Sequence, residues 1–316
     1  MNSHPTIDPS AVLTITLNPA IDISMAVDRL VPDRKLRADG CRREAGGGGV
    51  NVARVLHRLA VPCTSLVVVG GSTGAEVVDR MRREGLDVIE MPIDADTRES
   101  IAITESVTSR QYRISVPGPF VDDVERIRRE ILAAVGRAQI VVLSGSVPPG
   151  MPPDFLATTI EALPTGTTAI VDTSGPALVR VARGSAAIIK PSQRELAELV
   201  GWEPSTADEI ERAVRQVVDA GRLRAVVASR GPSGAMLASA DGPVRWFRPP
   251  AVHPVSTVGA GDSMVAGLAA SLARGQDLID AVRLGVAAGT AAVLTPGTEL
   301  CRPADVERFV DQVLVA

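Results

Sequence analysis

The chain has 316 residues, of which 45% are hydrophobic but only 2% aromatic, and its formal net charge at pH 7 is −4. This length suits one large α/β domain with a core of Val, Leu, Ala and Ile, and the slightly acidic balance argues against nucleic acid as a main partner. Three isolated cysteines exclude a disulfide framework and a cysteine-based zinc site, and without a signal pattern or a membrane-length apolar run we expect a cytoplasmic protein with no membrane partner.

Short apolar runs alternate along the chain with longer stretches of helical periodicity. Such runs are typical of strands buried on both faces of a parallel sheet, and their alternation with helices predicts βαβ units in a doubly wound sheet. We expect a flexible leader at 1–10 and one domain over 11–316. The predicted strands are 12–17, 66–69, 140–143, 169–171, 187–189 and 225–228. The predicted helices are 49–59, 75–84, 124–136, 153–163, 194–200, 207–220, 260–274, 278–294 and 303–315.

Two segments, approximately 23–45 and 97–118, interrupt this rhythm because they alternate polar and apolar residues and lack helical periodicity. Within the second segment, the runs 101–107 and 111–116 are joined by a short polar turn, a pattern that predicts an antiparallel hairpin. We expect the two segments to form together a small β-lid that is inserted into the main domain.

Residues 256–263 read STVGAGDS and are followed at once by an apolar helical run. The start of a helix gathers unpaired N–H donors and a partial positive charge, so Gly259, Ala260 and Gly261 are candidates for an anion hole. Asp262 lies at its mouth, where it can accept a proton from an attacking hydroxyl. The combination suggests phosphoryl transfer to an alcohol, although a plain helix start with an acidic residue near its cap explains this segment equally well.

A run of four glycines at 46–49 precedes an apolar helix, and glycine allows a ligand to approach the backbone closely. Asn51 follows and offers both a donor and an acceptor to a sugar hydroxyl. Asp22 comes soon after the first predicted strand, where open α/β sheets bind ligands, but a carboxylate in an ordinary turn is an equal alternative. The chain has neither a P-loop nor a dinucleotide fingerprint, so a nucleotide would bind without a Walker lysine.

Two further segments that follow predicted strands are candidates for nucleotide contact. The stretch 229–234, SRGPSG, could hold phosphate or ribose, although a turn before a hairpin is as good an explanation. In the stretch 190–195, Glu195 could hold magnesium through water, because this ion keeps most of its hydration shell. A capped helix start, with Ser192 as the cap and Glu195 three residues later, explains the same stretch without a ligand.

Four cations in the predicted lid bear on the choice of substrate. Each of them alone suits a solvated surface charge. On the strands of one lid, however, they could face a common phosphate and so favour a sugar phosphate over a free sugar. These residues are Lys35, Arg37, Arg98 and Arg113.

Taken together, the stretches 46–54 and 256–263 resemble the two signatures of the PfkB family of carbohydrate kinases, over about 12–310 of the chain. The resemblance implies a ribokinase-like fold. Within the family, the stretches 16–22 (TLNPAID) and 144–150 (SGSVPPG) are similar to those of the 6-phosphofructokinases. Fructose-1-phosphate and tagatose-6-phosphate kinases share most of these stretches, so the family is more specific than the sugar.

The resemblance also implies roles for individual residues. Asp262 would be the catalytic base, beside the anion hole formed by 259–261, and Lys35 and Arg98 would bind the phosphate of the substrate. The sugar would be contacted by Asp22, Gly47, Gly48, Asn51 and Ser146. The nucleotide and its magnesium would lie along Lys190, Ser192, Glu195, Ser229, Gly231 and Gly234. A potassium ion would lie near Ser256, Val258, Ala292, Thr295 and Gly297.

Two positions depart from the family pattern. Ser192 stands where the family commonly has Asn in an Asn-x-x-Glu motif that organises magnesium. Glu299 stands where close relatives often carry a basic residue, next to the potassium loop.

The implied reaction is the ATP-dependent phosphorylation of fructose 6-phosphate at O1, a step of glycolysis, with Mg²⁺ and potassium as ions. The resemblance also implies a homodimer built through the lids, in which Lys35 reaches across the interface. The alternatives are a kinase of the same fold that acts on tagatose 6-phosphate, fructose 1-phosphate or a nucleoside. An alternative of another class is a catalytically silent sensor of sugar phosphate or nucleotide, for which the serine at 192 is the only support.

Overall fold

The computed structural model describes residues 11–297 and 299–316, so the predicted leader at 1–10 lies outside the described residues. Within that part of the chain, fourteen strands form one sheet of ten and a separate sheet of four. The strands of the large sheet are β1 (Val12–Thr16), β4 (Cys63–Val69), β5 (Asp87–Pro92), β8 (Ile140–Ser144), β9 (Thr168–Asp172), β10 (Ile188–Ile189), β11 (Ala225–Ser229), β12 (Ala235–Ser239), β13 (Arg245–Arg248) and β14 (Leu314–Val315). The strands of the small sheet are β2 (Ala20–Val27), β3 (Arg42–Gly46), β6 (Arg98–Glu105) and β7 (Gln111–Ser115).

The large sheet has the order β14-β13-β12-β11-β10-β9-β8-β1-β4-β5. The strands from β5 to β11 are parallel, and β12, β13 and β14 continue the sheet in antiparallel pairs. From β1 the chain first builds outward through β4 and β5, and it later returns to β8 on the other side of β1. The carboxyl ends of β1 and β8 therefore form a switch point, where open α/β sheets bind their ligands.

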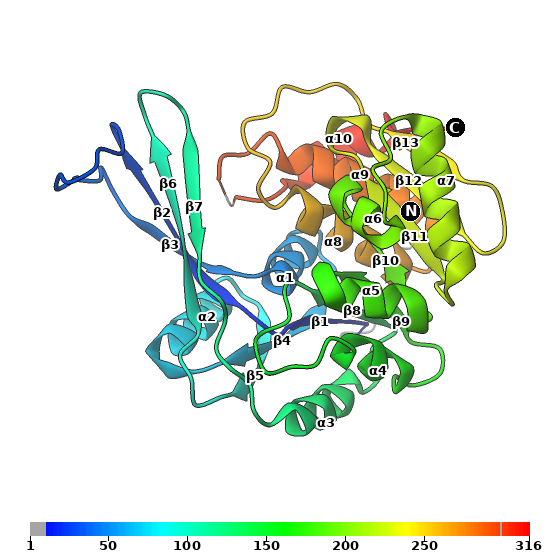
Figure 1. Ribbon diagram of the computed structural model, residues 1–316, viewed down its shortest axis with the longest axis horizontal. Helices are drawn as coiled ribbons and strands as arrows, with labels where there is room; N and C mark the ends of the chain where they lie inside the picture. The colour runs from blue at the N-terminus through cyan, green and yellow to red at the C-terminus, as the bar shows by residue number, and fades with distance from the viewer. Residues whose placement is uncertain (1–10, 298) are drawn as a thin grey trace, which may run out of the picture.

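Helices cover both faces of the large sheet (Figure 1). One face packs against α3 (Val124–Val135), α4 (Phe155–Glu161), α5 (Gly175–Gly184), α6 (Gln193–Val200) and α7 (Ala207–Ala220). The other packs against α1 (Gly48–Arg58), α8 (Ala260–Ala273), α9 (Leu278–Ala292) and α10 (Pro303–Val310). Among the described residues, no helix has both the length and the apolar character that crossing a bilayer requires.

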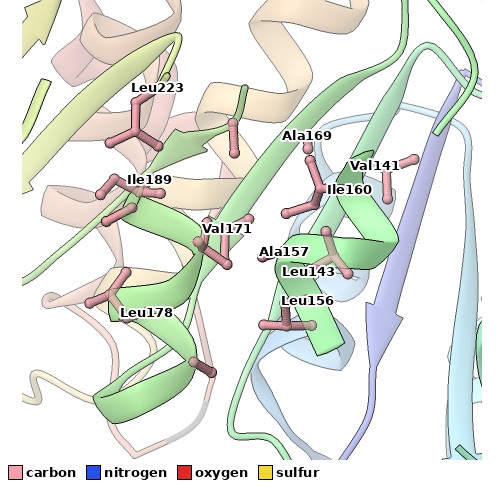
Figure 2. Packing of buried hydrophobic residues seen from close by; sticks show 14 of the residues in the cluster. Val141, Leu143, Leu156, Ala157, Ile160, Ala169, Val171, Leu178, Ile189 and Leu223 are labelled. Carbon is pink, nitrogen blue, oxygen red and sulfur yellow. The ribbon is translucent and has the colours of Figure 1, made fainter. Parts of the chain in front are cut away.

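Alternation along each strand divides the core into two layers. On β8, Val141 and Leu143 face α4, as Figure 2 shows, whereas Ile140 and Val142 belong to the cluster around α8 and α9. Every side chain of this strand is buried, which explains why its sequence is a continuous apolar run without polar alternation.

The small sheet has the order β3-β2-β6-β7 and projects from one end of the molecule (Figure 1). The predicted hairpin is present, because β6 and β7 pair antiparallel, and β2 pairs with β6 in parallel. The helix α2 (Gly71–Arg83) packs between this sheet and the strands β4 and β5 of the large sheet. Two groups of ion pairs fasten β3 to the main domain: Arg43 contacts Glu76 of α2 at 2.7 Å, and Arg54 of α1 contacts Glu44 at 3.6 Å.

The structure corrects several sequence predictions at the element level. The first lid strand begins at Ala20, not at 23, and the predicted helix 303–315 ends at Val310, because the last residues form the edge strand β14. The strand β5 and the helix α5 were not predicted. The strand β5 is an exposed, acidic edge strand and lacks the usual apolar pattern. The helix α5 does have buried apolar residues at helical spacing, namely Ala177, Leu178, Val181 and Ala182, so its signal was present in the sequence.

The contact between α8 and α9 depends on glycine. A Cβ added at Gly267 of α8 would lie 2.7 Å from the Cα atom of Gly285 on α9, and one added at Gly285 would lie 2.8 Å from the carbonyl oxygen of Met264. The two helix backbones therefore touch directly, without side chains between them. This close contact fixes α8, whose first turn carries Asp262.

We predict that Gly267→Ala lowers the free energy of unfolding by about 1–3 kcal/mol, because the new methyl group forces the two helices apart. Gly184→Ala is the matched control: it is also a glycine within a helix, but a Cβ there meets no atom within 4 Å. Urea unfolding followed by circular dichroism measures both. Equal stability of the two variants would contradict the direct contact.

Candidate active site

A pocket of about 480 Å³ lies between the small sheet and the carboxyl ends of β1, β8 and β9. It is thus at the switch point of the large sheet, with the small sheet as one of its walls. Most residues predicted for the sugar and for catalysis meet here, although they come from segments far apart in the sequence. Its lining includes the predicted residues Asp22, Gly47, Gly48, Asn51, Arg98, Arg113, Ser146, Glu195, Val258, Gly259 and Asp262.

Asp262 lies in the first turn of α8, just after the N-cap residue Gly259, whose φ of 75° is a left-handed conformation that suits glycine. The side-chain nitrogen Nδ2 of Asn51, in the first turn of α1, donates a hydrogen bond of 2.8 Å to Oδ2 of Asp262. Burial raises the pKa of Asp262 to about 6, and the nearby carboxylate of Asp172 adds to this effect. A carboxyl group with this pKa is ionised at neutral pH and is a stronger base than an ordinary aspartate.

An ion pair at the floor of the pocket was not predicted. Asp172, the last residue of β9, contacts Nζ of Lys190 at 3.1 Å, and both side chains are largely buried. Burial lowers the pKa of the Lys190 ammonium group, but the carboxylates of Asp172, Glu195 and Asp262 together outweigh it, so that the pKa is raised. The sequence signal was available, because Asp172 follows a predicted strand in the same way as Asp22 does. Lys190 lies beside Gly261, where a Cβ would be 3.5 Å from Nζ.

The four-glycine run brings the start of α1 close to the end of β8. A Cβ at Gly48 would lie 2.3 Å from the hydroxyl oxygen of Ser144, and Gly47 has a φ of 119° that suits only glycine. Part of the run is therefore required for packing between protein segments. The same packing places the first N–H groups of α1 at the edge of the pocket, where an anion or a hydroxyl could accept from them.

The small sheet contributes the charged wall of the pocket. Burial raises the pKa of Asp22, while Arg113, the hydroxyl of Ser100 and Arg98 act in the opposite direction. Arg98 donates from Nη1 to the hydroxyl of Ser115 at 2.8 Å and from Nη2 to the carbonyl oxygen of Asn18 at 3.3 Å. Among the described residues, neither Arg98 nor Arg113 has a carboxylate oxygen within 4.0 Å of its guanidinium, so the positive charge of both is available to a ligand.

The residues predicted for the nucleotide lie beside this pocket, and several have structural roles. Ser192 and Glu195 form the capping box of α6: Glu195 accepts from the Ser192 backbone at 2.8 Å, and Glu195 also lines the pocket. Ser229 lies next to Ser192 in an isolated parallel bridge. Gly231 begins a short 3₁₀ turn, and a Cβ at Gly234 would lie 1.9 Å from the carbonyl oxygen of Phe247, so this glycine is required for packing.

The residues predicted for potassium lie in two loops that are joined by hydrogen bonds. The hydroxyl of Ser256 donates to the carbonyl oxygen of Gly297 at 3.3 Å. The single hydroxyl proton of Thr295 is shared between two carbonyl oxygens, that of Ala292 at 2.8 Å and that of Leu300 at 2.9 Å. These loops adjoin Val258 and Gly259 of the pocket, and oxygen-rich backbone of this kind suits a hard monovalent cation.

Of the four predicted lid cations, Lys35 and Arg37 do not line the pocket, since both lie exposed on the loop between β2 and β3. Sequence reasoning also missed several small polar residues of the lining. Ser144 and Thr173 each carry a buried hydroxyl oxygen without a protein partner among the described residues, and Oδ1 of Asn51 is in the same situation. Such unpartnered polar atoms in one pocket fit a polar ligand such as a sugar. The missed lining residues are Ser100, Ser115, Ser144, Asp172, Thr173 and Ser174.

The family model described as "pfkB family carbohydrate kinase" matches residues 12–305. The ATP-dependent 6-phosphofructokinase isozyme 2 of Mycobacterium tuberculosis is 42% identical over 303 residues, which cover 95% of this chain and 89% of that protein. The protein of the same name from Escherichia coli K12 is 36% identical, covering 94% of this chain and 97% of that protein. The 1-phosphofructokinase of Bacillus subtilis is 30% identical, with coverage of 96% and 97%.

Solved structures agree with this result. Phosphofructokinase-2 from Escherichia coli in complex with potassium superimposes with a TM-score of 0.89 at 34% identity, covering 96% of this chain and 99% of that one. The Escherichia coli enzyme in complex with fructose-6-phosphate gives a TM-score of 0.87 at 32% identity with the same coverage. Ribokinase from Thermotoga maritima shares the fold alone, at 18% identity and a TM-score of 0.78 over 96% of this chain and 99% of that one. The expected α/β ribokinase-like fold with its small four-stranded sheet is confirmed, and the chain belongs to the pfkB family of carbohydrate kinases.

Proposed function

We propose that this kinase transfers the γ-phosphoryl group of ATP to O1 of fructose 6-phosphate. The observation that carries the proposal is the pairing, in one pocket, of Asp262 at the start of α8 with two arginines, Arg98 and Arg113, on the small sheet. A base at one end and cations at the other suit a substrate with both a hydroxyl and a phosphate. The names of the 42% and 36% identical relatives support ATP as donor and fructose 6-phosphate as acceptor.

In this proposal the sugar phosphate lies against the small sheet. Arg98 and Arg113 bind its 6-phosphate, because a guanidinium matches the geometry of phosphate oxygens. Asp22 accepts hydrogen bonds from the sugar hydroxyls, and the N–H groups at the start of α1, around Gly47 and Gly48, contact the sugar from the other side. Ser146, whose hydroxyl accepts from the side chain of Asn18 at 3.0 Å, completes the sugar contacts.

Asp262 then accepts the proton of the 1-hydroxyl as O1 attacks the γ-phosphorus. The new O1–P bond forms, the bond from that phosphorus to the bridging oxygen breaks, and ADP leaves with the electron pair. Asn51 keeps the carboxylate of Asp262 oriented through its hydrogen bond. The backbone N–H groups of 259–261 and the ammonium group of Lys190 stabilise the negative charge on the transferring group, and positioning with electrostatics supplies most of the rate.

The residues present fit the ions that the family uses. Among the described residues no cluster of three or more His, Cys, Asp or Glu could enclose a metal, which suits magnesium held mainly by phosphate and water, with Glu195 as its protein contact through water. Neutralisation of charge on the phosphates is the chemistry that bound Mg²⁺ supplies. Potassium would be held by backbone oxygens of the loops around Ser256 and Thr295, a proposal supported by the potassium complex of the Escherichia coli enzyme.

We further propose a cytoplasmic homodimer that forms through the small sheets. The edge strand β7 of the small sheet carries the exposed apolar side chains of Tyr112 and Ile114, and the exposed Val116 directly follows this strand. Light scattering of the full chain measures this assembly, and a monomeric mass would contradict it. Lys35, which is exposed near the same sheet, would then reach the partner's pocket. The three free cysteines support the proposed cytoplasmic location, because thiols stay reduced in the cytoplasm.

The substrate proposal predicts that fructose 6-phosphate has the highest kcat/KM in a panel with tagatose 6-phosphate, fructose 1-phosphate and free fructose, at matched ATP and magnesium, with and without potassium. Asp262→Asn should lower kcat on the preferred sugar by about 10²–10⁴-fold, because the amide cannot accept the proton. Preference for another sugar phosphate would overturn the substrate but not the base. Full activity of Asp262→Asn would overturn the base.

The raised pKa of Asp262 predicts the pH dependence of kcat. Because only the ionised carboxylate accepts a proton, kcat should fall about tenfold per pH unit below pH 6. The phosphates of the substrates also titrate near pH 6, so Asn51→Leu serves to separate the two effects. Loss of the hydrogen bond that favours the ionised form should move the acid limb to higher pH. An acid limb at the same pH in both proteins would assign it to the substrates.

The phosphate contact predicts that Arg98→Gln and Arg113→Gln each raise the KM for fructose 6-phosphate by about tenfold or more, because each variant removes a charged hydrogen-bond donor. The KM for ATP should change little. Arg110→Gln is the matched control, since Arg110 is exposed at the tip of the same hairpin and does not line the pocket. Steady-state kinetics with both substrates distinguishes these outcomes, and an equal effect of Arg110→Gln would show that only overall charge matters.

A further inference from the structure

Leu300 combines a strained backbone with a buried side chain directly behind the start of α8. Its φ of 60° is in the left-handed region, which an L-residue with a side chain rarely adopts, and its side chain is fully buried. A Cβ at Gly259 would lie 2.5 Å from Cδ2 of Leu300. The Leu300 side chain therefore packs against the residue that opens the helix carrying Asp262.

Arg58, in the last turn of α1, holds the backbone on both sides of Leu300. Its Nη1 donates to the carbonyl oxygen of Glu299 and, at 3.3 Å, to that of Cys301. The carbonyl of Leu300 itself accepts from the hydroxyl of Thr295 at 2.9 Å. Three consecutive carbonyl groups are thus fixed by side chains, which is how the surrounding structure maintains the strained conformation of Leu300.

The helix α1 is consequently linked to the start of α8 at both of its ends, directly at the first and through the loop of Leu300 at the last. At its first turn Asn51 donates to Asp262, and at its last turn Arg58 holds the loop that supports Gly259. Three of the residues considered for potassium, Ala292, Thr295 and Gly297, lie in the same part of the chain as Leu300. A continuous series of contacts thus links Arg58, through the loop of Leu300, to Gly259 in the pocket lining.

We propose that Arg58 is a positioning residue for phosphoryl transfer, acting through Leu300 on the N–H groups of 259–261 and on Asp262. The proposal rests on the roles proposed above for Gly259 and Asp262. Arg58 lies outside the sugar and nucleotide contacts and lines a separate cavity, together with Arg274, on the far side of the loop. Its loss therefore affects the chemical step and leaves the substrate contacts in place.

The test is the steady-state kinetics of Arg58→Ala. Its kcat should fall by about 10- to 100-fold, since a displacement of about 1 Å in catalytic groups has effects of this size. The KM values for sugar phosphate and ATP should stay within about twofold of those of the original protein. Arg58→Lys should restore part of kcat, because an ammonium group can still donate to carbonyl oxygens.

Arg274→Ala is the matched control. Arg274 lines the same cavity and donates from Nη2 to the carbonyl oxygen of Leu59 at 2.9 Å, but within 11–297 and 299–316 it makes no hydrogen bond or ion pair with the loop of Leu300. Its kcat should remain unchanged. A loss of kcat as large as that of Arg58→Ala, or a fall in the melting temperature of Arg58→Ala without any change of kcat, would overturn the positioning role.

A double-mutant cycle tests whether Arg58 and Leu300 act in one chain of contacts. Leu300→Ala removes the atoms that touch Gly259, so it should also lower kcat, and the double variant with Arg58→Ala should be no slower than the slower single variant. Independent, multiplied losses would contradict the proposal. All variants are measured with whichever sugar phosphate the unaltered protein turns over best, so a wrong substrate assignment leaves this test intact.

Discussion

The hydrogen bond between Asn51 and Asp262 is the contact on which the rest of the site depends. It joins residues 211 positions apart in sequence and links the first turns of α1 and α8. Both helices pack on the same face of the large sheet, and both point their N-termini, with their unpaired N–H groups, at the switch point between β1 and β8. The site therefore lies where the N-terminal ends of α1 and α8 come together, and the side chain of Asn51 spans the distance between them.

This arrangement concentrates charge that the fold must tolerate. Asp22, Asp172 and Asp262 lie around one pocket, and burial raises the pKa of each. The compensating positive charges come from different elements. Lys190, which directly follows β10, contacts Asp172, and Arg98 and Arg113 of the small sheet counteract the effect of burial on the pKa of Asp22. Burying an ionised carboxylate lowers the stability of the fold, and it also makes that carboxylate a stronger proton acceptor. The loss of stability and the gain in basicity therefore have the same cause, which is burial.

Much of the fold could be predicted because strands such as β8 are buried on both faces and read as unbroken apolar runs. Elements without that pattern, such as β5 at an exposed edge, escaped prediction. In the site, glycine-rich helix starts located Gly48, Asn51 and Asp262, and an acidic residue after a strand located Asp22. The second rule, applied to Asp172, would have found that residue as well. The orientation of Asn51 toward Asp262 could not be predicted, since it depends on how two helices distant in sequence meet. Ser192 and Glu195 show a further difficulty: the same sequence motif is expected for a helix-capping box and for a contact with magnesium, so the sequence could not distinguish the two.

The short connections of the small sheet have a mechanical consequence. Only residues 17–19 separate β1 from β2, and only Gly47 separates β3 from α1. No slack linker exists at either junction, and the ion pairs of Arg43 and Arg54 stiffen the base of the sheet further. The small sheet, Asp22 and the first turn of α1 are therefore joined as one connected unit. A change in the sequence of either junction would alter the shape of the pocket wall and the position of the α1 start together, because neither can shift without the other.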